Sequence, residues 1–323
     1  MSLHPWNEPV FASVVRRAER LPHALLFHGP RGVGKLALAE HLVRFLLCEA
    51  KTGDKPCGRC EACRWLDVGS HPDFRRLEPE ALAQQPPPDS EDLPAEAPAR
   101  KGKPSLEIKV EQVRELADFL NVGSHRAGRR VALVHPAEDM TVAASNALLK
   151  ALEEPPGGAM FVLVSHRPAR LLPTIRSRCV AVPVPIPQAK AALKWLAAQG
   201  VKDPERRLAY AGGAPLRALA EAEQGESIDR LLELIRSGSE IIVEDRAELE
   251  ALAEALQRYA IDQAVIASGA QELFLTRGRR GSASARAWLA YARKMGENRA
   301  LARHPLAPKL FAAEMLAAMP GRT

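Results

Sequence analysis

A glycine-rich stretch that ends in lysine constrains the fold of this chain more than any other feature. Residues 29–36 read Gly-Pro-Arg-Gly-Val-Gly-Lys-Leu, which matches the phosphate-binding P-loop pattern G-x-x-x-x-G-K-[ST] at every position but the last. The apolar run over residues 24–28 predicts a buried strand before the loop, and residues 36–47 have helical apolar spacing after it. A chance glycine-rich turn, the alternative, does not explain both flanks. We therefore expect a genuine strand–loop–helix unit.

The last position of the loop decides its chemistry. In a working P-loop, backbone N–H groups and the lysine hold the phosphates, while the Ser or Thr hydroxyl ligates magnesium. Leu36 has no oxygen to offer the metal. The candidate nucleotide-binding residues are therefore Gly29, Gly32, Gly34 and Lys35, in a degenerate site. Two interpretations stay open: ATP binding without turnover, or a loop retained only for its strand-to-helix geometry.

Composition sets the broad class. A chain of 323 residues suits two or three domains, and its low aromatic content of 5% points to an aliphatic, helix-rich protein. No apolar run approaches the roughly 18 residues that a membrane span needs, and the first residues lack the layout of a signal peptide. We expect a cytoplasmic protein without a membrane partner. The net charge of +6 is compatible with a nucleic-acid neighbourhood but is too modest to show direct contact.

Four of the five cysteines are closely spaced. They form a C-x8-C-x2-C-x2-C arrangement at Cys48, Cys57, Cys60 and Cys63. This spacing predicts a structural Zn²⁺ site with four thiolate ligands and no open position for water. Disulfide pairing is the alternative, which a reducing cytoplasm disfavours. Cys179 stands apart and is expected to be a small buried residue.

The remaining pattern divides the chain into segments. Residues 84–104 are rich in Pro, Gln and charged side chains, which predicts a disordered surface insertion. Alternating helices and strands around a P-loop predict a parallel sheet with helices on both faces. Beyond a proline-rich hinge at residues 183–187, everything is expected to be helical. The remaining elements expected from periodicity are a helix over 108–120, a strand over 130–135, a helix over 143–152 and a strand over 160–164.

Two longer signatures suggest a family. Residues 143–156 read Ala-Ala-Ser-Asn-Ala-Leu-Leu-Lys-Ala-Leu-Glu-Glu-Pro-Pro, and residues 174–179 read Thr-Ile-Arg-Ser-Arg-Cys. With the cysteine cluster and the His-Pro-Asp-Phe of residues 71–74, they make the chain resemble the bacterial clamp-loader family of AAA+ proteins. The resemblance implies an AAA+ P-loop domain with a zinc knuckle over residues 1–181, a small helical lid over 182–224 and an all-α oligomerisation collar over 225–323.

The resemblance also implies a function and partners. Members of this family form a five-subunit ring, with delta and gamma/tau subunits, that loads the sliding clamp onto primed DNA as part of a DNA polymerase holoenzyme. The arginine of the Ser-Arg-Cys motif, here Arg178, reaches a neighbouring subunit's ATP as an arginine finger. An arginine suits this role because it is always charged and its fork matches phosphate oxygens. The alternative for Arg178 is a salt bridge within its own chain.

Departures from the family pattern affect the ATPase machinery. The strand at residues 131–134 runs into His135-Pro136-Ala137-Glu138, where a hydrolysing subunit carries acidic residues that hold magnesium. Leu216 stands where motor subunits carry a nucleotide-sensing arginine, although Arg217 is adjacent. We expect a non-hydrolysing subunit with no polymerase activity of its own. The alternatives are an active gamma/tau-like ATPase and a DNA-binding zinc protein without sequence preference.

Overall fold

The computed structural model describes two compact units, residues 1–186 and 187–323. The predicted insertion at 84–104 lies, apart from Pro104, outside the described residues. Within the described chain, no helix has both the length and the apolar character needed to cross a membrane. The described residues are 3–16, 21–83, 104–122, 128–223, 225–278, 281–302 and 307–321.

The first unit is built on a five-stranded sheet with the strand order β2-β3-β4-β1-β5. All four strand pairings are parallel, as the P-loop and the alternating pattern predict. The strands are β1 (Ala24–His28), β2 (Phe74–Leu77), β3 (Arg130–Val134), β4 (Ala159–Ser165) and β5 (Val180–Pro183).

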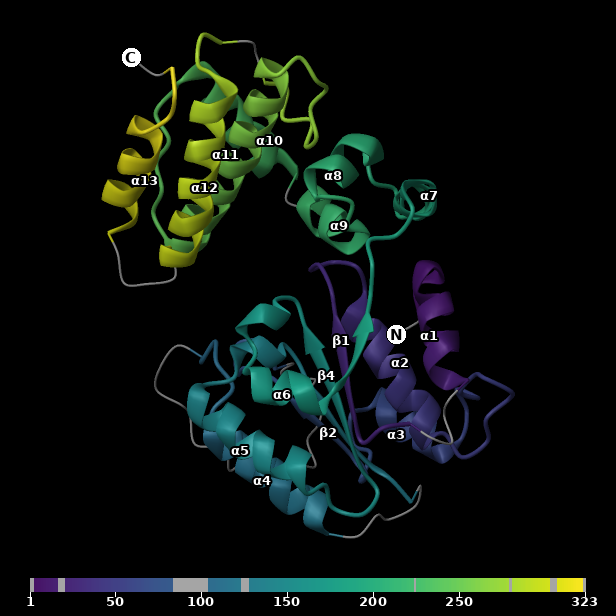
Figure 1. The fold of residues 1–323 in the computed structure, drawn as a ribbon. Helices are drawn as coiled ribbons and strands as arrows, with labels where there is room; N and C mark the ends of the chain where they lie inside the picture. Colours follow the sequence, from purple (N-terminus) through teal and green to yellow (C-terminus); the bar gives the residue numbers. More distant parts are fainter. Residues whose placement is uncertain are drawn as a thin grey trace, which may run out of the picture. The chain divides into compact units, whose positions relative to one another are not determined.

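Helices cover both faces of this sheet, as Figure 1 shows. One face carries α4, α5 and α6, and the other carries α1, α2 and α3. Short 3-10 turns lie at Pro5–Asn7, Ala137–Asp139 and Pro168–Arg170. The helices of this unit are α1 (Glu8–Val15), α2 (Lys35–Leu47), α3 (Glu61–Asp67), α4 (Val110–Asn121), α5 (Val142–Glu153) and α6 (Pro173–Arg178).

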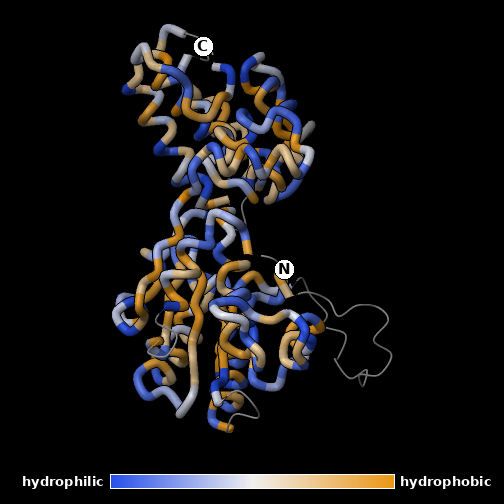
Figure 2. Tube along the Cα trace, turned by 90° about the vertical axis from the view of Figure 1, so that its right-hand side faces the viewer, coloured by the Kyte–Doolittle hydropathy of each residue, from blue (hydrophilic) through white to orange (hydrophobic). Residues whose placement is uncertain are grey.

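The core follows from the period-2 alternation of the central strands. Ala132 and Val134 of β3, with Phe161 and Leu163 of β4, pack toward α4, α5 and α6. The intervening strand residues, such as Val162, are equally buried, because a parallel sheet covered on both faces needs apolar side chains throughout. These strands appear in Figure 2 as hydrophobic stretches of the tube. This core holds the ends of the strands in a fixed register.

The second unit is all-helical among its described residues. A small hydrophobic cluster around Leu196 and Leu208 joins its first three helices, and a larger one around Leu252 and Leu256 joins the later helices. The proposed boundary between lid and collar at residue 224 stays a prediction. The helices are α7 (Ala189–Ala198), α8 (Pro204–Tyr210), α9 (Pro215–Glu223), α10 (Gly225–Ser237), α11 (Arg246–Ala267), α12 (Ala285–Leu301) and α13 (Pro308–Ala317).

Most predicted elements are found within one or two residues of their expected ends, and the strand at 24–28 matches at both ends. The sequence gives no strand signal for β2. This strand has only four residues and includes Arg75 and Arg76, so it lacks the apolar run by which strands are recognised. It nevertheless pairs with β3 at the edge of the sheet.

Candidate functional site

Three of the central strands end at the same edge of the sheet and deliver the candidate residues there. The P-loop follows β1, His135 follows β3, and His166 follows β4. Because the strands are parallel and β4 lies between β1 and β3, their carboxyl ends lie side by side. Ligand sites of open parallel sheets lie at such edges. The structure therefore brings the P-loop together with two histidines that come from separate parts of the sequence.

The lysine of the P-loop is held inside its own loop. Lys35 is only 2% exposed, and its Nζ donates hydrogen bonds to the carbonyl oxygen of Gly29 at 2.8 Å and to that of Pro30. Burial lowers the pKa of Lys35 to about 8, although the negative charge of Glu138 opposes this shift. Gly29 has a φ of +152°, and a Cβ atom there would lie 2.2 Å from the carbonyl oxygen of Val184. Only glycine fits at that position.

The N-terminal turn braces the loop from outside. The side chain of Asn7 donates hydrogen bonds to the carbonyl oxygens of Val33, at 3.0 Å, and Gly34, at 3.2 Å. The indole of Trp6 also donates to the Val33 carbonyl, at 3.0 Å. These contacts occupy loop carbonyls and leave the loop N–H groups to other partners. The sequence offered no signal for them, because they join segments about 26 residues apart.

The two histidines form a partly buried pair. The rings of His135 and His166 meet edge to face with centroids 5.3 Å apart. Burial, and after it the positive charges of neighbouring arginine and lysine side chains, lower the pKa of His135 to about 4 and that of His166 to about 3. Both imidazoles are therefore neutral at pH 7. Sequence reasoning identified His135 only as a missing acidic residue, and it missed His166.

The carboxylate of Glu138 lies at this edge and already accepts a hydrogen bond. Both oxygens of Glu138 accept a hydrogen bond from the backbone N–H of His166, at 3.0 and 3.2 Å. Leu36 supplies no oxygen, and His135 is the first residue after β3. Leu36 and His135 thus offer magnesium no oxygen, and the carboxylate found at this edge, that of Glu138, already accepts a backbone N–H.

The arginine of the Ser-Arg-Cys motif lies at a different place. Arg178 is the last residue of α6, and its side chain is 35% exposed. Its Nη2 pairs with Glu153 Oε1 at 2.6 Å, while Nη1 donates to the Thr174 carbonyl at 3.0 Å and to Ser177 Oγ at 3.5 Å. The intrachain salt bridge considered as an alternative is therefore present. It does not bury the guanidinium, which stays accessible to another molecule.

Arg217, the residue next to the expected sensor position Leu216, forms ion pairs within the second unit. Arg217 pairs with Glu221 at 2.7 Å and with Glu254 of α11. Arg258, buried, pairs with the same two carboxylates at 3.3 and 3.0 Å. Removing one partner from such a buried charge network is costly. Arg217 therefore holds α9 against α11.

The four cysteines converge on one centre. Cys48 caps the C-terminal end of α2. Cys60 is the N-cap residue of α3, and Cys63 lies within α3. The four Sγ atoms all lie within 4.8 Å of one another, and those of Cys48 and Cys60 are 3.9 Å apart. A tetrahedral site with Zn–S bonds of about 2.3 Å has sulfurs about 3.8 Å apart. The cluster can hold a metal ion, and its dimensions are consistent with zinc.

The surroundings of the sulfurs also suit a cation. Backbone N–H groups of Arg59 and Cys60 donate to the Cys57 sulfur and lower the pKa of this thiol to about 6. Burial instead raises the pKa of Cys63 to about 12. A bound cation would deprotonate all four thiols, because the metal ligand is the thiolate. The donor set therefore fits a structural zinc ion.

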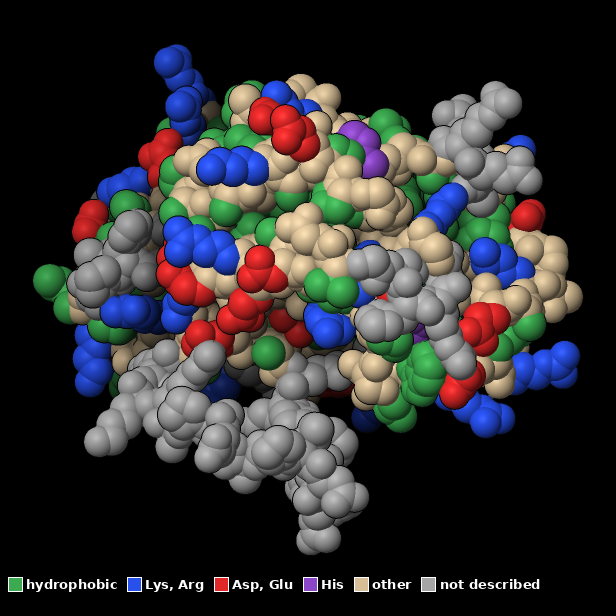
Figure 3. Space-filling model, turned by 90° about the horizontal axis from the view of Figure 1, so that it is seen from below, with side chains coloured by type: hydrophobic (Ala, Val, Ile, Leu, Met, Phe, Trp, Pro, Cys, Tyr) green, Lys and Arg blue, Asp and Glu red, His purple; other side chains and the backbone are tan. Residues whose placement is uncertain are grey.

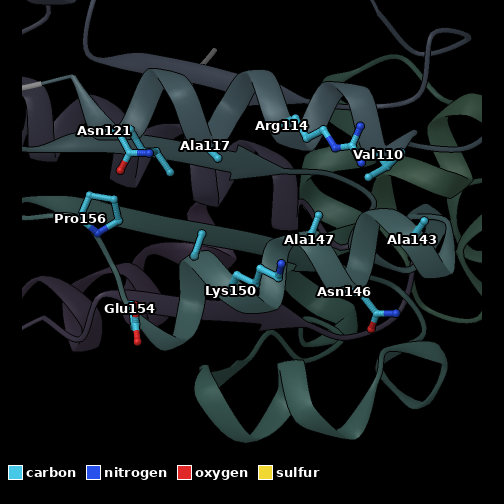
Figure 4. Close-up of a pocket in the computed structure, with 12 residues that line it drawn as sticks. Val110, Arg114, Ala117, Asn121, Ala143, Asn146, Ala147, Lys150, Glu154 and Pro156 are labelled. Atoms are coloured by element: carbon cyan, nitrogen blue, oxygen red, sulfur yellow. The ribbon is translucent and has the colours of Figure 1, made fainter.

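A groove between α4 and α5 is a further concavity of the first unit. It encloses about 520 Å³, and Figure 4 shows Arg114 of α4 and Lys150 of α5 on its walls. Alanines and Glu154 also line it. On the face shown in Figure 3, acidic and basic side chains are likewise interspersed. Neither the groove nor that face has the single-sign field that marks a dedicated phosphate surface.

Comparisons with known proteins agree with this geometry. The family model described as DNA polymerase III, delta subunit matches residues 10–187, more than half of the chain. The delta' subunit of Pseudomonas aeruginosa is 43% identical over 69% of this chain and 62% of its own length, and that of Escherichia coli is 37% identical over 68% and 61%. The tau subunit of Salmonella typhimurium is 32% identical over 54% of this chain and 25% of its own length.

The chain thus spans less than two thirds of the length of the curated delta' relatives it matches. The matched region contains the whole P-loop sheet, the cysteine cluster and the Ser-Arg-Cys motif. The resemblance to the clamp-loader family is confirmed, and so is the expected α/β AAA+ fold. This chain belongs to the DNA polymerase III delta' subunit family.

Proposed function

We propose that this chain is a non-hydrolysing subunit of the DNA polymerase III clamp loader. It supplies Arg178 in trans to the ATP of a neighbouring gamma or tau subunit. With delta and gamma/tau subunits, it helps to load the sliding clamp onto primed DNA. The observation that carries the proposal is the contrast within one unit between a partly exposed arginine, Arg178, and a P-loop in which Leu36 offers magnesium no oxygen.

The geometry of Arg178 supports the donor role. A guanidinium has five N–H donors, and the contacts within the chain engage three of them at most. The Thr174 carbonyl and Glu153 orient the side chain, while the remaining donors can reach phosphate oxygens. An arginine oriented in advance loses less conformational entropy when it binds.

The alternative of an active gamma/tau-like ATPase is disfavoured by the P-loop edge of the sheet. A hydrolysing site needs a hydroxyl and an acidic residue for magnesium, and here Leu36 and His135 stand at these positions. Leu216 stands at the position expected for the nucleotide sensor, and the adjacent Arg217 is paired with Glu221 and Glu254.

Zinc is part of the proposal as a structural ion held by the four cysteines. It would connect the end of α2 to α3 in a segment too short to have its own core. Four thiolates leave no position for a reacting water, so the ion would have no catalytic role.

The test is the ATPase rate of a clamp loader reconstituted with Arg178→Ala. We expect the rate of ATP hydrolysis to fall by about 10³-fold or more at the served ATP site, which is the neighbouring subunit's site that Arg178 reaches. This is the contribution of a trans arginine finger. Assembly of the complex should be unchanged, because the substitution removes only a partly exposed ion pair and local hydrogen bonds.

Arg176→Ala is the matched control, since Arg176 is an exposed arginine of the same short helix. This variant should turn over ATP at the wild-type rate. Wild-type turnover with Arg178→Ala, or equal loss in both variants, would remove the assignment.

A further inference from the structure

We propose that Glu153 is a positioning residue for Arg178, which sets the rate of ATP hydrolysis in the neighbouring subunit by holding the guanidinium in one orientation. The inference rests on the proposed function, because it gives a second side chain a role in the same reaction. Glu153 is the last residue of α5, and its Oε1 pairs with Arg178 Nη2 at 2.6 Å. The carboxylate is assigned no contact with the nucleotide and acts only through the arginine.

The ion pair joins two helices that share one core. Leu152, the residue before Glu153, is buried, and so is Ile175 of α6. Both side chains belong to the hydrophobic cluster that packs α4, α5 and α6 on the sheet, and α5 contacts α6 directly. The backbones that carry Glu153 and Arg178 are therefore fixed relative to each other before any partner binds.

The guanidinium is held from two directions. Glu153 binds Nη2, and the Thr174 carbonyl, one turn earlier in α6, accepts a hydrogen bond from Nη1 at 3.0 Å. The Ser177 hydroxyl donates to the same carbonyl at 3.0 Å, which gives the serine of the Ser-Arg-Cys motif a place in this arrangement. None of these contacts engages Nε of Arg178, so its N–H is left for a phosphate oxygen.

Two opposite effects of Glu153 on the neighbouring site can be compared. A long side chain loses rotamer freedom when a ligand fixes it, and an arginine that is already oriented loses less at that step. Against this, a carboxylate repels phosphate. Because Glu153 is about half exposed, solvent screens the repulsion, whereas the direct contact at 2.6 Å still restrains the guanidinium. We therefore expect Glu153 to raise the rate, by a modest factor.

The experiment measures ATP hydrolysis at the served site in loaders reconstituted with Glu153→Ala, Glu153→Gln, Arg178→Ala, or both alanine substitutions together. Glu153→Ala should lower kcat by roughly fivefold, with the KM for ATP within about twofold of wild type, because the finger acts mainly in the transition state. Glu153→Gln should lose less, since its amide oxygen can still accept a hydrogen bond from Nη2. In the Arg178→Ala background, removal of Glu153 should have no further effect.

Glu154→Ala is the matched control. Glu154 is the next carboxylate along the chain and is also exposed, but it lines the groove between α4 and α5. A loader with this variant should hydrolyse ATP at the wild-type rate.

Three results would overturn the inference: wild-type or faster turnover with Glu153→Ala, an equal loss with Glu154→Ala, or a further loss in the double variant, which would place the action of Glu153 elsewhere. Failure of the proposed function has a different signature, which is wild-type turnover with Arg178→Ala. In that case the role of Glu153 fails with it.

Discussion

Two cationic side chains of the first unit, Lys35 and Arg178, differ in burial and in the partners that they bind. Lys35 is 2% exposed, lies at the carboxyl edge of the sheet and binds carbonyls of its own loop. Arg178 is 35% exposed, ends a short helix and pairs with a carboxylate that is itself 49% exposed. Burial lowers the pKa of Lys35 to about 8, whereas a guanidinium keeps its charge at every working pH. Lys35 is therefore enclosed by its own loop, whereas Arg178 lies at the surface of the unit.

Under the proposed function, the difference explains how an ATPase fold can lose hydrolysis and keep a role in it. The apolar core specifies the sheet, so the P-loop geometry survives the loss of magnesium ligands. The exposed arginine depends on a few surface contacts that are independent of those ligands. Variants that affect one cation should therefore leave the other unaffected.

The largest expected effect concerns the metal cluster, which is linked to Lys35 through α2. Cys60→Ser removes one of four ligands and should lower both zinc content and the stability of the segment around α3, by several kcal/mol. Zinc analysis and protease sensitivity would measure this. A loader reconstituted with this variant should keep the turnover that depends on Arg178. Equal zinc in wild type and variant would exclude Cys60 as a ligand.

A smaller effect is expected when Arg178 is replaced by lysine, which keeps the positive charge but loses the planar, forked guanidinium. Arg178→Lys cannot make two parallel hydrogen bonds to phosphate, so turnover at the served ATP site should fall by about 10²-fold. Steady-state ATPase of the reconstituted loader gives the rate. Near-normal turnover would mean that charge alone suffices and that the orientation by Glu153 is irrelevant.

The next effect is a pH dependence at Lys35. Its pKa is about 8 in the folded chain and 10.5 when exposed, so the unfolded state holds more protons between these values. The free energy of unfolding should rise as pH increases from about 8 to 10.5, on the order of 2 kcal/mol more in wild type than in Lys35→Met. Chemical denaturation at several pH values would measure the difference. Parallel curves for both proteins would contradict the burial of a charged amine.

The smallest effect is expected at the carboxylate that holds the exposed arginine. Glu153→Gln removes the charge of a half-exposed ion pair, which solvent screens, so the free energy of unfolding should change by less than about 1 kcal/mol. Urea denaturation would measure it. A loss well above that value would show that the Arg178 contact is part of the fold, which would weaken the comparison.

The sequence predicted the parts of the site that are continuous along the chain. The P-loop, its flanking strand and helix, and the closely spaced cysteines are local patterns, and their chemistry follows from residue type and spacing. The role of Arg178 was inferred from an ordered motif and stays a prediction. The bounds of the helices shifted by only a residue or two, as capping and fraying allow.

What the sequence could not predict depends on strand order. His135 and His166 become neighbours only because β3 and β4 pair in parallel, and Glu153 reaches Arg178 only because α5 packs on α6. The turn containing Trp6 and Asn7 meets the loop through contacts with no sequence periodicity. Such pairings are set by tertiary packing, which a single sequence does not display.

The most direct test of the account compares two variants in the same reconstituted clamp loader: Lys35→Met, which disables this chain's own loop, and Arg178→Ala, which removes the donated arginine. The measurement is the steady-state ATPase rate on primed DNA. The account predicts wild-type turnover for Lys35→Met and, for Arg178→Ala, a loss of about 10³-fold at the served site. Reduced turnover with Lys35→Met and normal turnover with Arg178→Ala would contradict it.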